Sequence, residues 1–524
     1  MVVMDMGGHG YLVGARNSVR LAISNCVSAD GGEYMTFHRC NDIGGTRGVA
    51  RREAMRRFAS RLACSLSALV IAACGGGTSS RPLPAAVALT APANLANGLS
   101  GTVNLAASVP ADAAVSAVEF QIDGSAVGSV ATPPYQISLD AATYPAGQHV
   151  VRARARDGAG NVSGWSSATI SIDGGSDVMP GFTKNEPWVG GLNGATAFAQ
   201  AADGRLFIAE QGGRLRVVKN GALLSTAFVQ LSVDSAGERG LIGVALHPDF
   251  AGNGWVYLHY TTPQNGAHNR ISRFVANGDV SSGIETVLVE LPPLSSATNH
   301  NGGALHFGND GKLYVGVGDN ADNTRSQNLA DPLGKMLRFN DDGSIPSDNP
   351  FFASQNGVAR AIWASGLRNP FTFAVQPGTG GRIYINDVGE ATWEEIDVGI
   401  AGANYGWHGS EGPNNITSGV SAPLFAYQHS ATVPPGSGPG GFFTGSAITG
   451  GTFYPRSGSF PAGYRGSYFF ADLAGHFVAR LDSANDNAAY TFARVSDDPV
   501  DLLVGADGAL YVLMRGSVAR IGTP

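Results

Sequence analysis

The chain has 524 residues, which is too long for one ordinary domain and predicts two or three folded units. Its 73 glycines and 27 prolines, with only 14% charged residues, favour turn-rich β-structure over helical bundles. The formal net charge is −7, and the segment before Cys74 is rich in arginine, so the rest of the chain is more acidic still. This balance argues against nucleic-acid binding, because phosphates require basic surface.

Residues 1–54 show no sustained hydrophobic periodicity and precede a segment that reads as an export signal. An export signal must lie at the terminus of a chain. We therefore interpret 1–54 as an extension produced by a start codon placed too early, with Met55 as the true start.

The segment 55–73 has the organisation of a signal peptide: a basic start, then an apolar run that is too short to span a bilayer permanently. It ends in Ile-Ala-Ala before Cys74, which resembles the bacterial lipobox, in which the cysteine is lipidated. The glycine- and serine-rich residues 74–82 predict a flexible tether. We expect a cell-envelope lipoprotein, periplasmic or outer-membrane, or a secreted protein if Cys74 is incidental. No cysteine follows Cys74, so no disulfide stabilises the remaining 450 residues.

Residues 83–174 contain several short runs in which apolar and polar residues alternate. Such runs at 118–122, 135–139 and 149–156, bounded by turn residues, predict strands of a β-sandwich. The segments VEFQIDG and ARARDGAGN resemble bacterial immunoglobulin-like domains. No catalytic cluster lies in this region, which favours a spacer or adhesion module.

One pattern recurs along residues 181–524, and internal repeats of this kind indicate a repeat architecture. Each copy has a glycine followed by an apolar or aromatic run, and then a second apolar run that in most copies carries an arginine. The copies begin at Gly204, Gly254, Gly311, Gly381, Gly466 and Gly508. Each copy predicts two antiparallel strands, buried on both faces as in a stacked blade. The fold class predicted is therefore all-β, a six-bladed β-propeller preceded by a small immunoglobulin-like β-sandwich.

Loops that gather at one end of the central channel would form the site. His300 is the best candidate for a general base, because two glycines that free the backbone follow it closely and an imidazole titrates near neutral pH. Arg368 is a candidate for stabilising a developing negative charge. Taken alone, a loop histidine is more often structural or merely exposed, and an arginine of this kind equally often binds loop carbonyls. His306 lies on an alternating run and is interpreted as packing.

Several segments carry a resemblance to a known family. They are GERGLIGVALHPDF, NHNGGALHFGNDGKLYVGVGDN, GKMLRFNDDGSIPSDNPF, GLRNPFTFAV, DVGEATWEEIDVG and GANYGWHGSEG, and they follow one another within 181–524. Together they resemble the soluble glucose/sorbosone dehydrogenases, which oxidise aldose sugars with pyrroloquinoline quinone (PQQ) and Ca²⁺.

The resemblance implies roles for individual residues. His300 matches the base that takes the proton of the anomeric hydroxyl, and Arg368 matches the arginine near the reacting carbonyl of the quinone. Asn369 would contact the cofactor. Backbone oxygens at Gly389 and Glu390 match those that hold Ca²⁺.

The chain also departs from the glucose-oxidising members of this family. Glu238, Asn299 and Asn320 stand at cofactor-facing positions where those members have glutamine, aspartate and glutamine. Those members bind the PQQ carboxylates with one lysine and two arginines, whereas the matching segments 472–476 and 498–501 contain neither lysine nor arginine. Here the chain looks closer to the branch that includes the hedgehog-interacting-protein-like propellers.

The departures bear on cofactor affinity. The loss of several charge-assisted hydrogen bonds, at about 1.5–3 kcal/mol each, would weaken cofactor binding by orders of magnitude. His476 or Arg515 is a candidate replacement cation.

Three functions remain open. The first is an exported PQQ- and Ca²⁺-dependent aldose dehydrogenase that uses a small sugar and an external electron acceptor. The second is a non-catalytic, Ca²⁺-stabilised propeller that binds carbohydrate or a protein partner. The third is a Ca²⁺-dependent lactonase, because other six-bladed propellers hydrolyse lactones on a channel metal.

Overall fold

The computed structural model describes the strands within residues 2–39 and then residues 86–111, 113–378, 380–429 and 441–524. The chain divides into two units, Met1–Pro82 and Leu83–Pro524. The predicted signal peptide, Cys74 and the tether lie outside the described residues. No helix in the described ranges is long and apolar enough to cross a membrane.

The described strands of the first unit form a four-stranded sheet of order β2-β1-β3-β4. Its strands are β1 (Val2–Met6), β2 (His9–Val13), β3 (Leu21–Val27) and β4 (Glu33–Arg39). Residues 1–54 show no sustained hydrophobic periodicity, so this sheet was not predicted from the sequence.

Residues 88–172 form a β-sandwich of two sheets. The strands are β5 (Ala88–Ala91), β6 (Ala96–Leu99), β7 (Thr102–Ser108), β8 (Ala117–Ile122), β9 (Ser125–Val130), β10 (Tyr135–Asp140), β11 (Gly147–Arg156) and β12 (Ser166–Ile172). Three strands pair in the order β10-β7-β5 and five in the order β6-β12-β11-β8-β9. Fully buried Leu105, Phe120, Val151 and Ile170 belong to one core cluster that draws on both sheets. The predicted alternating runs are β8, β10 and β11.

The described residues between 183 and 522 form six further sheets. Five of them use consecutive strands: β14-β15-β16-β17 with β18 on β16, β19-β20-β21-β22, β23-β24-β25-β26, β27-β28-β29-β30 and β31-β32-β33-β34. The sixth has the order β13-β37-β36-β35. Strand β13 comes from the start of this region and pairs with the last strand, β37. The first and last strands of the region therefore lie in the same sheet. The helices that the structure describes in this region are short, such as α2 (Phe250–Asn253) and η2 (Gly357–Ala361).

The bounds of these strands are as follows. They are β13 (Thr183–Gly190), β14 (Ala195–Gln200), β15 (Leu206–Glu210), β16 (Arg214–Lys219), β17 (Ala222–Leu223), β18 (Val229–Gln230), β19 (Leu241–Leu246), β20 (Trp255–Thr262), β21 (His268–Asn277), β22 (Val280–Pro293), β23 (Leu305–Phe307), β24 (Leu313–Val317), β25 (Lys335–Phe339), β26 (Ile362–Ser365), β27 (Pro370–Val375), β28 (Ile383–Asp387), β29 (Trp393–Gly399), β30 (Phe425–Gln428), β31 (Ile448–Phe453), β32 (Tyr468–Asp472), β33 (Phe477–Asp482), β34 (Ala488–Arg494), β35 (Pro499–Val504), β36 (Leu510–Met514) and β37 (Ser517–Gly522).

Each copy of the sequence repeat forms the second and third strands of one of these sheets. The pairs are β15–β16, β20–β21, β24–β25, β28–β29, β32–β33 and β36–β37, and all six are antiparallel. Most residues of these strands are buried, as expected when sheets stack face to face. The predicted antiparallel pairing is therefore confirmed.

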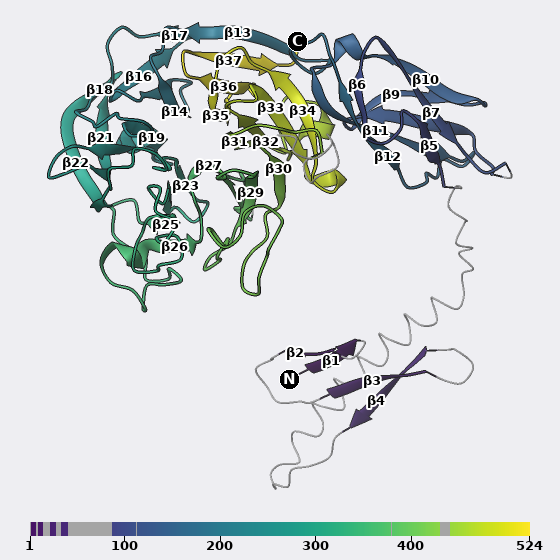
Figure 1. Cartoon of the computed structure of the whole chain (residues 1–524), viewed down its shortest axis with the longest axis horizontal. Coiled ribbons are helices and arrows are strands. Elements are labelled where there is room, and N and C mark those ends of the chain that lie inside the picture. The colour runs from purple at the N-terminus through teal and green to yellow at the C-terminus, as the bar shows by residue number, and fades with distance from the viewer. Residues whose placement is uncertain are drawn as a thin grey trace. The chain divides into compact units, whose positions relative to one another are not determined.

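The first strands of the sheets form a closed ring. β14 contacts β19, β19 contacts β23, β23 contacts β27, β27 contacts β31, β31 contacts β35, and β35 returns to β14. Figure 1 looks along the axis of this ring, with the first strands around its centre and β22, β26 and β30 at its rim. The fold is a β-propeller.

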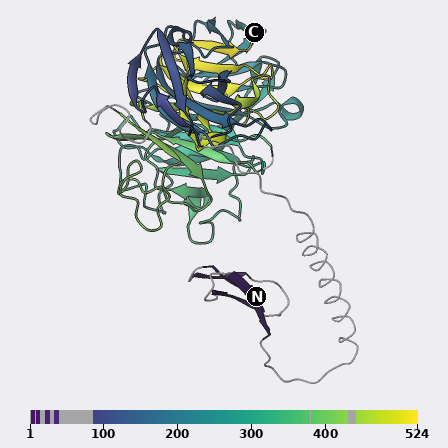
Figure 2. The ribbon, with the colours of Figure 1, turned by 90° about the vertical axis from the view of Figure 1, so that its right-hand side faces the viewer.

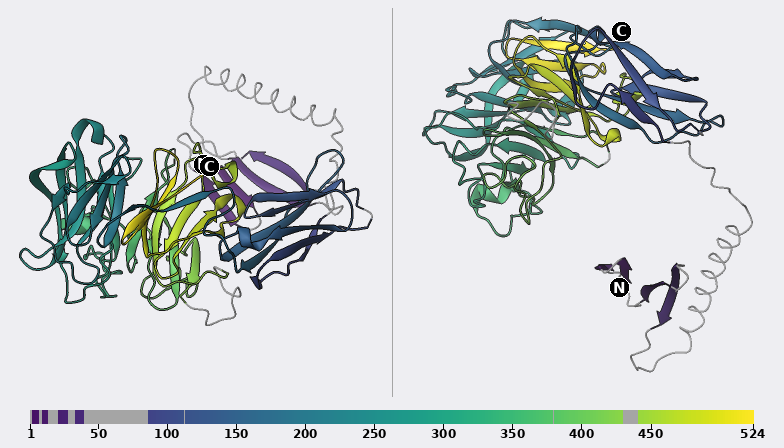
Figure 3. Two further views of the ribbon diagram at one scale, coloured as in Figure 1. Left: turned by 90° about the horizontal axis from the view of Figure 1, so that it is seen from above. Right: turned by 45° about the vertical axis from the view of Figure 1, so that its right-hand side comes forward.

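The sandwich packs against the rim of the sheet β31–β34, as Figures 2 and 3 show. Strand β11 contacts β34. The buried amide of Gln148 donates to the Ala489 carbonyl at 2.8 Å and accepts from the Phe442 N–H at 2.6 Å. Arg480, buried in the propeller, donates to the Asp123 carbonyl of the sandwich at 3.1 Å. The two domains therefore share buried hydrogen bonds.

Candidate active site

The loops that hold the predicted site residues lie at one end of the ring. Each sheet is antiparallel, so the loop before its first strand and the loop after its second strand emerge at the same end. Segments 237–240, 299–303 and 366–369 precede the first strands β19, β23 and β27. Segments 318–320 and 387–390 lie at or just after the ends of the second strands β24 and β28. The topology therefore gathers loops that are far apart in sequence.

A cavity of about 250 Å³ opens at this end of the ring. Five of the six first strands contribute a residue to its wall, namely Thr196, Ile242, Phe371, Thr449 and Val500. The cavity therefore lies on the ring axis. Two of the predicted site residues, Glu238 and Asn369, also line it.

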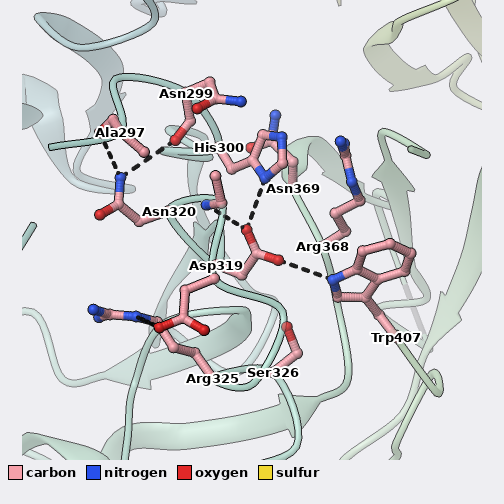
Figure 4. Close-up of polar contacts among 12 residues, drawn as sticks. Ala297, Asn299, His300, Asp319, Asn320, Arg325, Ser326, Arg368, Asn369 and Trp407 are labelled. Carbon is pink, nitrogen blue, oxygen red and sulfur yellow. Dashed lines mark hydrogen bonds and ion pairs between the residues drawn. The ribbon is translucent and has the colours of Figure 1, made fainter. Parts of the chain in front are cut away.

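His300 forms a side-chain pair with an aspartate. Its Nδ1 lies 2.7 Å from Oδ1 of Asp319, whose other oxygen accepts a hydrogen bond from the indole N–H of Trp407 at 2.9 Å (Figure 4). Asp319 is 1% exposed, and His300 is 8% exposed. The indole N–H thus holds the buried carboxylate against the imidazole.

This pairing fixes what the imidazole can do. When Asp319 is ionised it can only accept, so Nδ1 of His300 must donate to it. The neutral ring then presents the Nε2 lone pair, and no hydrogen bond from the described part of the chain uses that atom. The arrangement leaves Nε2 able to take a proton, as a general base requires.

The backbone around His300 depends on its glycines. His300 itself has φ +54°, a left-handed conformation that histidine adopts more readily than most residues. Gly302 has φ +66°, and a Cβ there would lie 2.6 Å from the Gly316 carbonyl oxygen. A Cβ on Gly303 would lie 2.6 Å from the Ile242 carbonyl oxygen. The two glycines allow this loop to pack against its neighbours at backbone distance, as the sequence predicts.

Glu238 joins the cavity wall to the histidine loop. Its Oε2 accepts from the backbone N–H of His300 at 2.7 Å and from the side-chain amide of Asn369 at 3.4 Å. His300 does not itself line the cavity, and it borders it through Glu238 and Asn369. The amide oxygen of Asn369 in turn accepts from the Gly302 N–H at 3.0 Å. The structure brings these three predicted residues together.

Arg368 and Asn369 are positioned by a residue that was not singled out from the sequence. Both backbone N–H groups donate to the carboxylate of Asp387, at 2.9 and 2.7 Å. Burial raises the pKa of Asp387 to about 7, although these two N–H groups act in the opposite direction. The Arg368 guanidinium donates to the Val388 carbonyl at 3.0 Å, while its buried Nε has no partner among the described residues. The guanidinium therefore keeps donor capacity.

Asn320 and Asn299 contact each other rather than the cavity. Asn320 is fully buried, and its amide accepts from the Ser295 N–H and donates to the carbonyls of Ala297 and Asn299 (Figure 4). Its side chain thus supports the segment that leads into His300. Neither asparagine lines the cavity, so their predicted contact with a cofactor stays a prediction.

Gly389 and Glu390 lie in a turn beside the cavity. The N–H groups of residues 390–393 all donate to one oxygen of Glu411, which fixes the turn. On β29 the carboxyl of Asp397 is fully buried, and neither of its oxygens has a hydrogen-bond partner among the described residues. Burial and the neighbouring Glu395 and Asp387 raise the pKa of Asp397 well above its usual range. Asp397 thus keeps two buried oxygens that no hydrogen bond from the described residues uses.

Whether these residues fit Ca²⁺ depends on the donor set. Calcium binds six to eight oxygens, including backbone carbonyls. No group of three or more His, Cys, Asp or Glu side chains within the described residues is arranged to hold a metal ion. A calcium site here would therefore depend on backbone carbonyls such as those of Gly389 and Glu390.

The cavity wall combines apolar side chains with charged side chains of both signs. Its wall includes apolar Ile242, Phe371, Leu473 and Val500. Its charged lining residues are Glu238, Asp498 and Arg515. Arg515, one of the two residues predicted from the sequence as a replacement cation, is thus the cation in this lining.

Four residues of the site carry roles that sequence reasoning did not assign. Asp319 and Trp407 fix the imidazole, Asp387 fixes the arginine loop, and Gln211 lines the cavity. Asp319 and Asp387 each lie at the end of a second strand, where a buried acid followed by a turn is a readable signal. Trp407 gave no such signal, because its contact with Asp319 spans 88 residues.

Comparison with known proteins agrees with this geometry. The sequence profile of the bacterial Ig domain matches residues 86–153. The aldose sugar dehydrogenase YliI of Escherichia coli (strain K12) is 29% identical over 381 residues, covering 68% of this chain and 93% of that protein. The hedgehog-interacting protein of Mus musculus is 32% identical over 214 residues, covering 35% of this chain and 30% of that protein.

The fold is also found in a solved structure. The PQQ-bound aldose sugar dehydrogenase of Streptomyces coelicolor superimposes with a TM-score of 0.52 at 22% identity, covering 65% of this chain and 98% of that chain. The sequence profile described as glucose / sorbosone dehydrogenase matches residues 192–522, which is more than half of the chain. The chain therefore belongs to the glucose/sorbosone dehydrogenase family.

Proposed function

We propose that this protein oxidises an aldose sugar in the axial cavity, with PQQ as the oxidant, Ca²⁺ as its metal and His300 as the general base. The observation that carries the proposal is the His300–Asp319 pair held beside the cavity by Glu238 and Asn369. Membership of the family supplies the reaction class, and the aldose sugar dehydrogenase relative supports the substrate class.

The chain's own residues handle the proton. Nε2 of His300 accepts the proton of the anomeric hydroxyl, and Asp319 stabilises the imidazolium that forms. When bound, PQQ supplies the acceptor for the hydride that leaves the anomeric carbon, so the sugar loses two electrons and becomes a lactone. The free donors of Arg368 stabilise negative charge that develops on an oxygen at the cavity edge.

Calcium and the anchoring of the protein belong to the same proposal. The carbonyls of Gly389 and Glu390 would hold Ca²⁺ beside the cavity, and a hard cation there would supply Lewis-acid polarisation of a bound oxygen ligand. The six sheets would be the blades of a six-bladed propeller. A lipid on Cys74, after removal of residues 55–73, would place this domain in the cell envelope, with access to sugars and to an external electron acceptor.

The test is dye-linked sugar oxidation by the purified full chain after incubation with PQQ and Ca²⁺. We expect turnover with at least one member of an aldose panel, and loss of turnover without PQQ or in His300→Ala. His247→Ala is a matched control, because His247 lies on the loop after β19 at the opposite end of the ring. Absence of turnover across a broad panel would contradict the proposal.

A second candidate function is a non-catalytic propeller that binds a protein or carbohydrate partner. Asp498 in the cavity wall, where the resemblance expects a cation, favours it, as does the similarity to the hedgehog-interacting protein. Binding to a glycan array without any sugar turnover would support this alternative.

A further inference from the structure

Arg515 has an unusual position for a charged side chain. It follows β36 directly and lines the axial cavity, half buried. One guanidinium nitrogen donates to the side-chain oxygen of Gln211 at 2.6 Å, and another donates to the Ala195 carbonyl at 3.2 Å. Both partners are neutral, so the positive charge is oriented toward the site without being neutralised.

The acids nearest to Arg515 do not pair with it. Asp498, which also lines the cavity, has its carboxylate 2.9 Å from Nε2 of His476. Asp497 accepts from the Gly516 N–H at 3.0 Å. Over the described ranges, no carboxylate lies within ion-pair distance of the Arg515 guanidinium. Burial lowers the pKa of Arg515, and Asp498 and Asp497 only partly oppose this. A partly desolvated cation without a counter-charge favours an anionic ligand.

Gln211 links this cation to the catalytic loop. Its side-chain amide donates to the carbonyls of Gly237 and Arg239, at 2.5 and 2.9 Å, while its oxygen accepts from Arg515. The residue between those two carbonyls is Glu238, which accepts from the backbone of His300. Arg515 is therefore held at a fixed place on the same wall that positions the base.

We propose that the Arg515 guanidinium binds a carboxylate of the quinone cofactor, in place of the lysine and arginines that the segments 472–476 and 498–501 lack. This inference rests on the proposed function, because it names the residue that makes PQQ binding possible in this cavity. Arg515 suits the role because a guanidinium can bind a carboxylate through two parallel hydrogen bonds. His476 is the weaker candidate, since Asp498 already pairs with it.

The test is titration of the purified full chain with PQQ at saturating Ca²⁺, followed by calorimetry and by the absorbance of PQQ. We expect Arg515→Gln to raise the Kd for PQQ by about 10- to 100-fold. Arg515→Lys keeps the charge but loses the planar guanidinium, so its Kd for PQQ should lie between those of the parent chain and Arg515→Gln. Arg520→Gln is the matched control, because Arg520 lies in the same terminal hairpin but pairs with exposed Asp507.

A second variant separates ligand binding from folding. Asp498→Arg restores a cation at a lining position. Combined with Arg515→Gln it should recover most of the lost affinity for PQQ, whereas any change in Tm caused by Arg515→Gln should remain. An Arg515→Gln protein that binds PQQ as tightly as the parent chain would overturn the inference and leave the proposed function intact. A parent chain that binds no PQQ would overturn both.

Discussion

Nδ1 of His300 lies 2.7 Å from Oδ1 of Asp319, although 19 residues separate them in the chain. Strand β23 leads away from the loop that holds His300. Strand β24 then returns the chain to the same end of the ring, where Asp319 follows it. The buried aspartate determines which imidazole nitrogen is free to accept a proton.

Replacing Asp319 should therefore affect turnover more than binding. In Asp319→Asn the amide no longer favours the Nδ1–H tautomer or stabilises the imidazolium, so we expect kcat to fall by about 10²- to 10⁴-fold. The Kd for PQQ should change little. The measurement is steady-state dye-linked kinetics beside a PQQ titration. Asp322→Asn, on the same loop and with an exposed carboxylate, is the control and should keep parental kcat.

Gly302 should be far less tolerant than a glycine of similar backbone conformation in open space. Gly302 and Gly311 have φ +66° and +72°, but only at Gly302 would a Cβ meet backbone atoms. Gly311→Ala should cost about 1 kcal/mol of unfolding free energy from φ strain alone. Gly302→Ala should cost roughly 2–4 kcal/mol, because overpacking is added. Chemical denaturation measures both, and equal losses would show that close packing does not explain Gly302.

The free energy of unfolding should fall as pH rises, because Asp501 is buried. This carboxyl is buried in β35, and burial raises its pKa to about 7, against the N–H groups of Phe198 and Leu502. Since its unfolded pKa is near 3.9, the folded chain holds the extra proton between about pH 4 and pH 7. Its stabilising contribution is complete below about pH 4 and is lost as pH rises to about 7, with a slope of at most about 1.4 kcal/mol per pH unit.

The Asp501→Asn variant tests this sign. An amide does not ionise, so denaturant unfolding between pH 5 and pH 8 should show a shallower decline than in the parent chain. Identical slopes in the two proteins would mean that Asp501 does not titrate in this window.

The buried hydrogen bonds of Gln148 should tie the sandwich to the propeller. Gln148→Ala leaves the Ala489 carbonyl and the Phe442 N–H without this partner, which should cost about 1–3 kcal/mol. The Tm should fall while kcat and KM stay at parental values. Gln136→Ala, on the exposed face of β10, should leave the Tm unchanged. A Gln148→Ala protein with a parental Tm would show that this contact is not stabilising.

The strand pairs of the propeller could be predicted because their pattern recurs. Each copy, such as that beginning at Gly311, combines a turn glycine with two runs buried on both faces, and six copies reinforce one another. The first strands could not be predicted so readily: β23 has three residues, too few for a periodic signal. The pairing of β13 with β37 joins segments more than 300 residues apart, and no local pattern encodes it.

The site was predictable in its loops but not in its contacts. His300, Glu238 and Asn369 could be named from residue type and resemblance, and the structure joins them through Glu238. Asn320 was predicted at a cofactor-facing position, but its amide is used by loop carbonyls and an N–H. A sequence shows which side chains can donate and accept, whereas tertiary packing decides which of them remain free.

The most direct test of the central claim is single-turnover reduction of bound PQQ by an aldose, followed by stopped-flow absorbance in the parent chain and in His300→Ala. The account predicts that sugar reduces the cofactor in the parent chain, and that the rate falls by at least about 10²-fold in the variant while its Kd for PQQ is unchanged. Equal rates in the two proteins, or no reduction by any aldose in the parent chain loaded with PQQ and Ca²⁺, would contradict it.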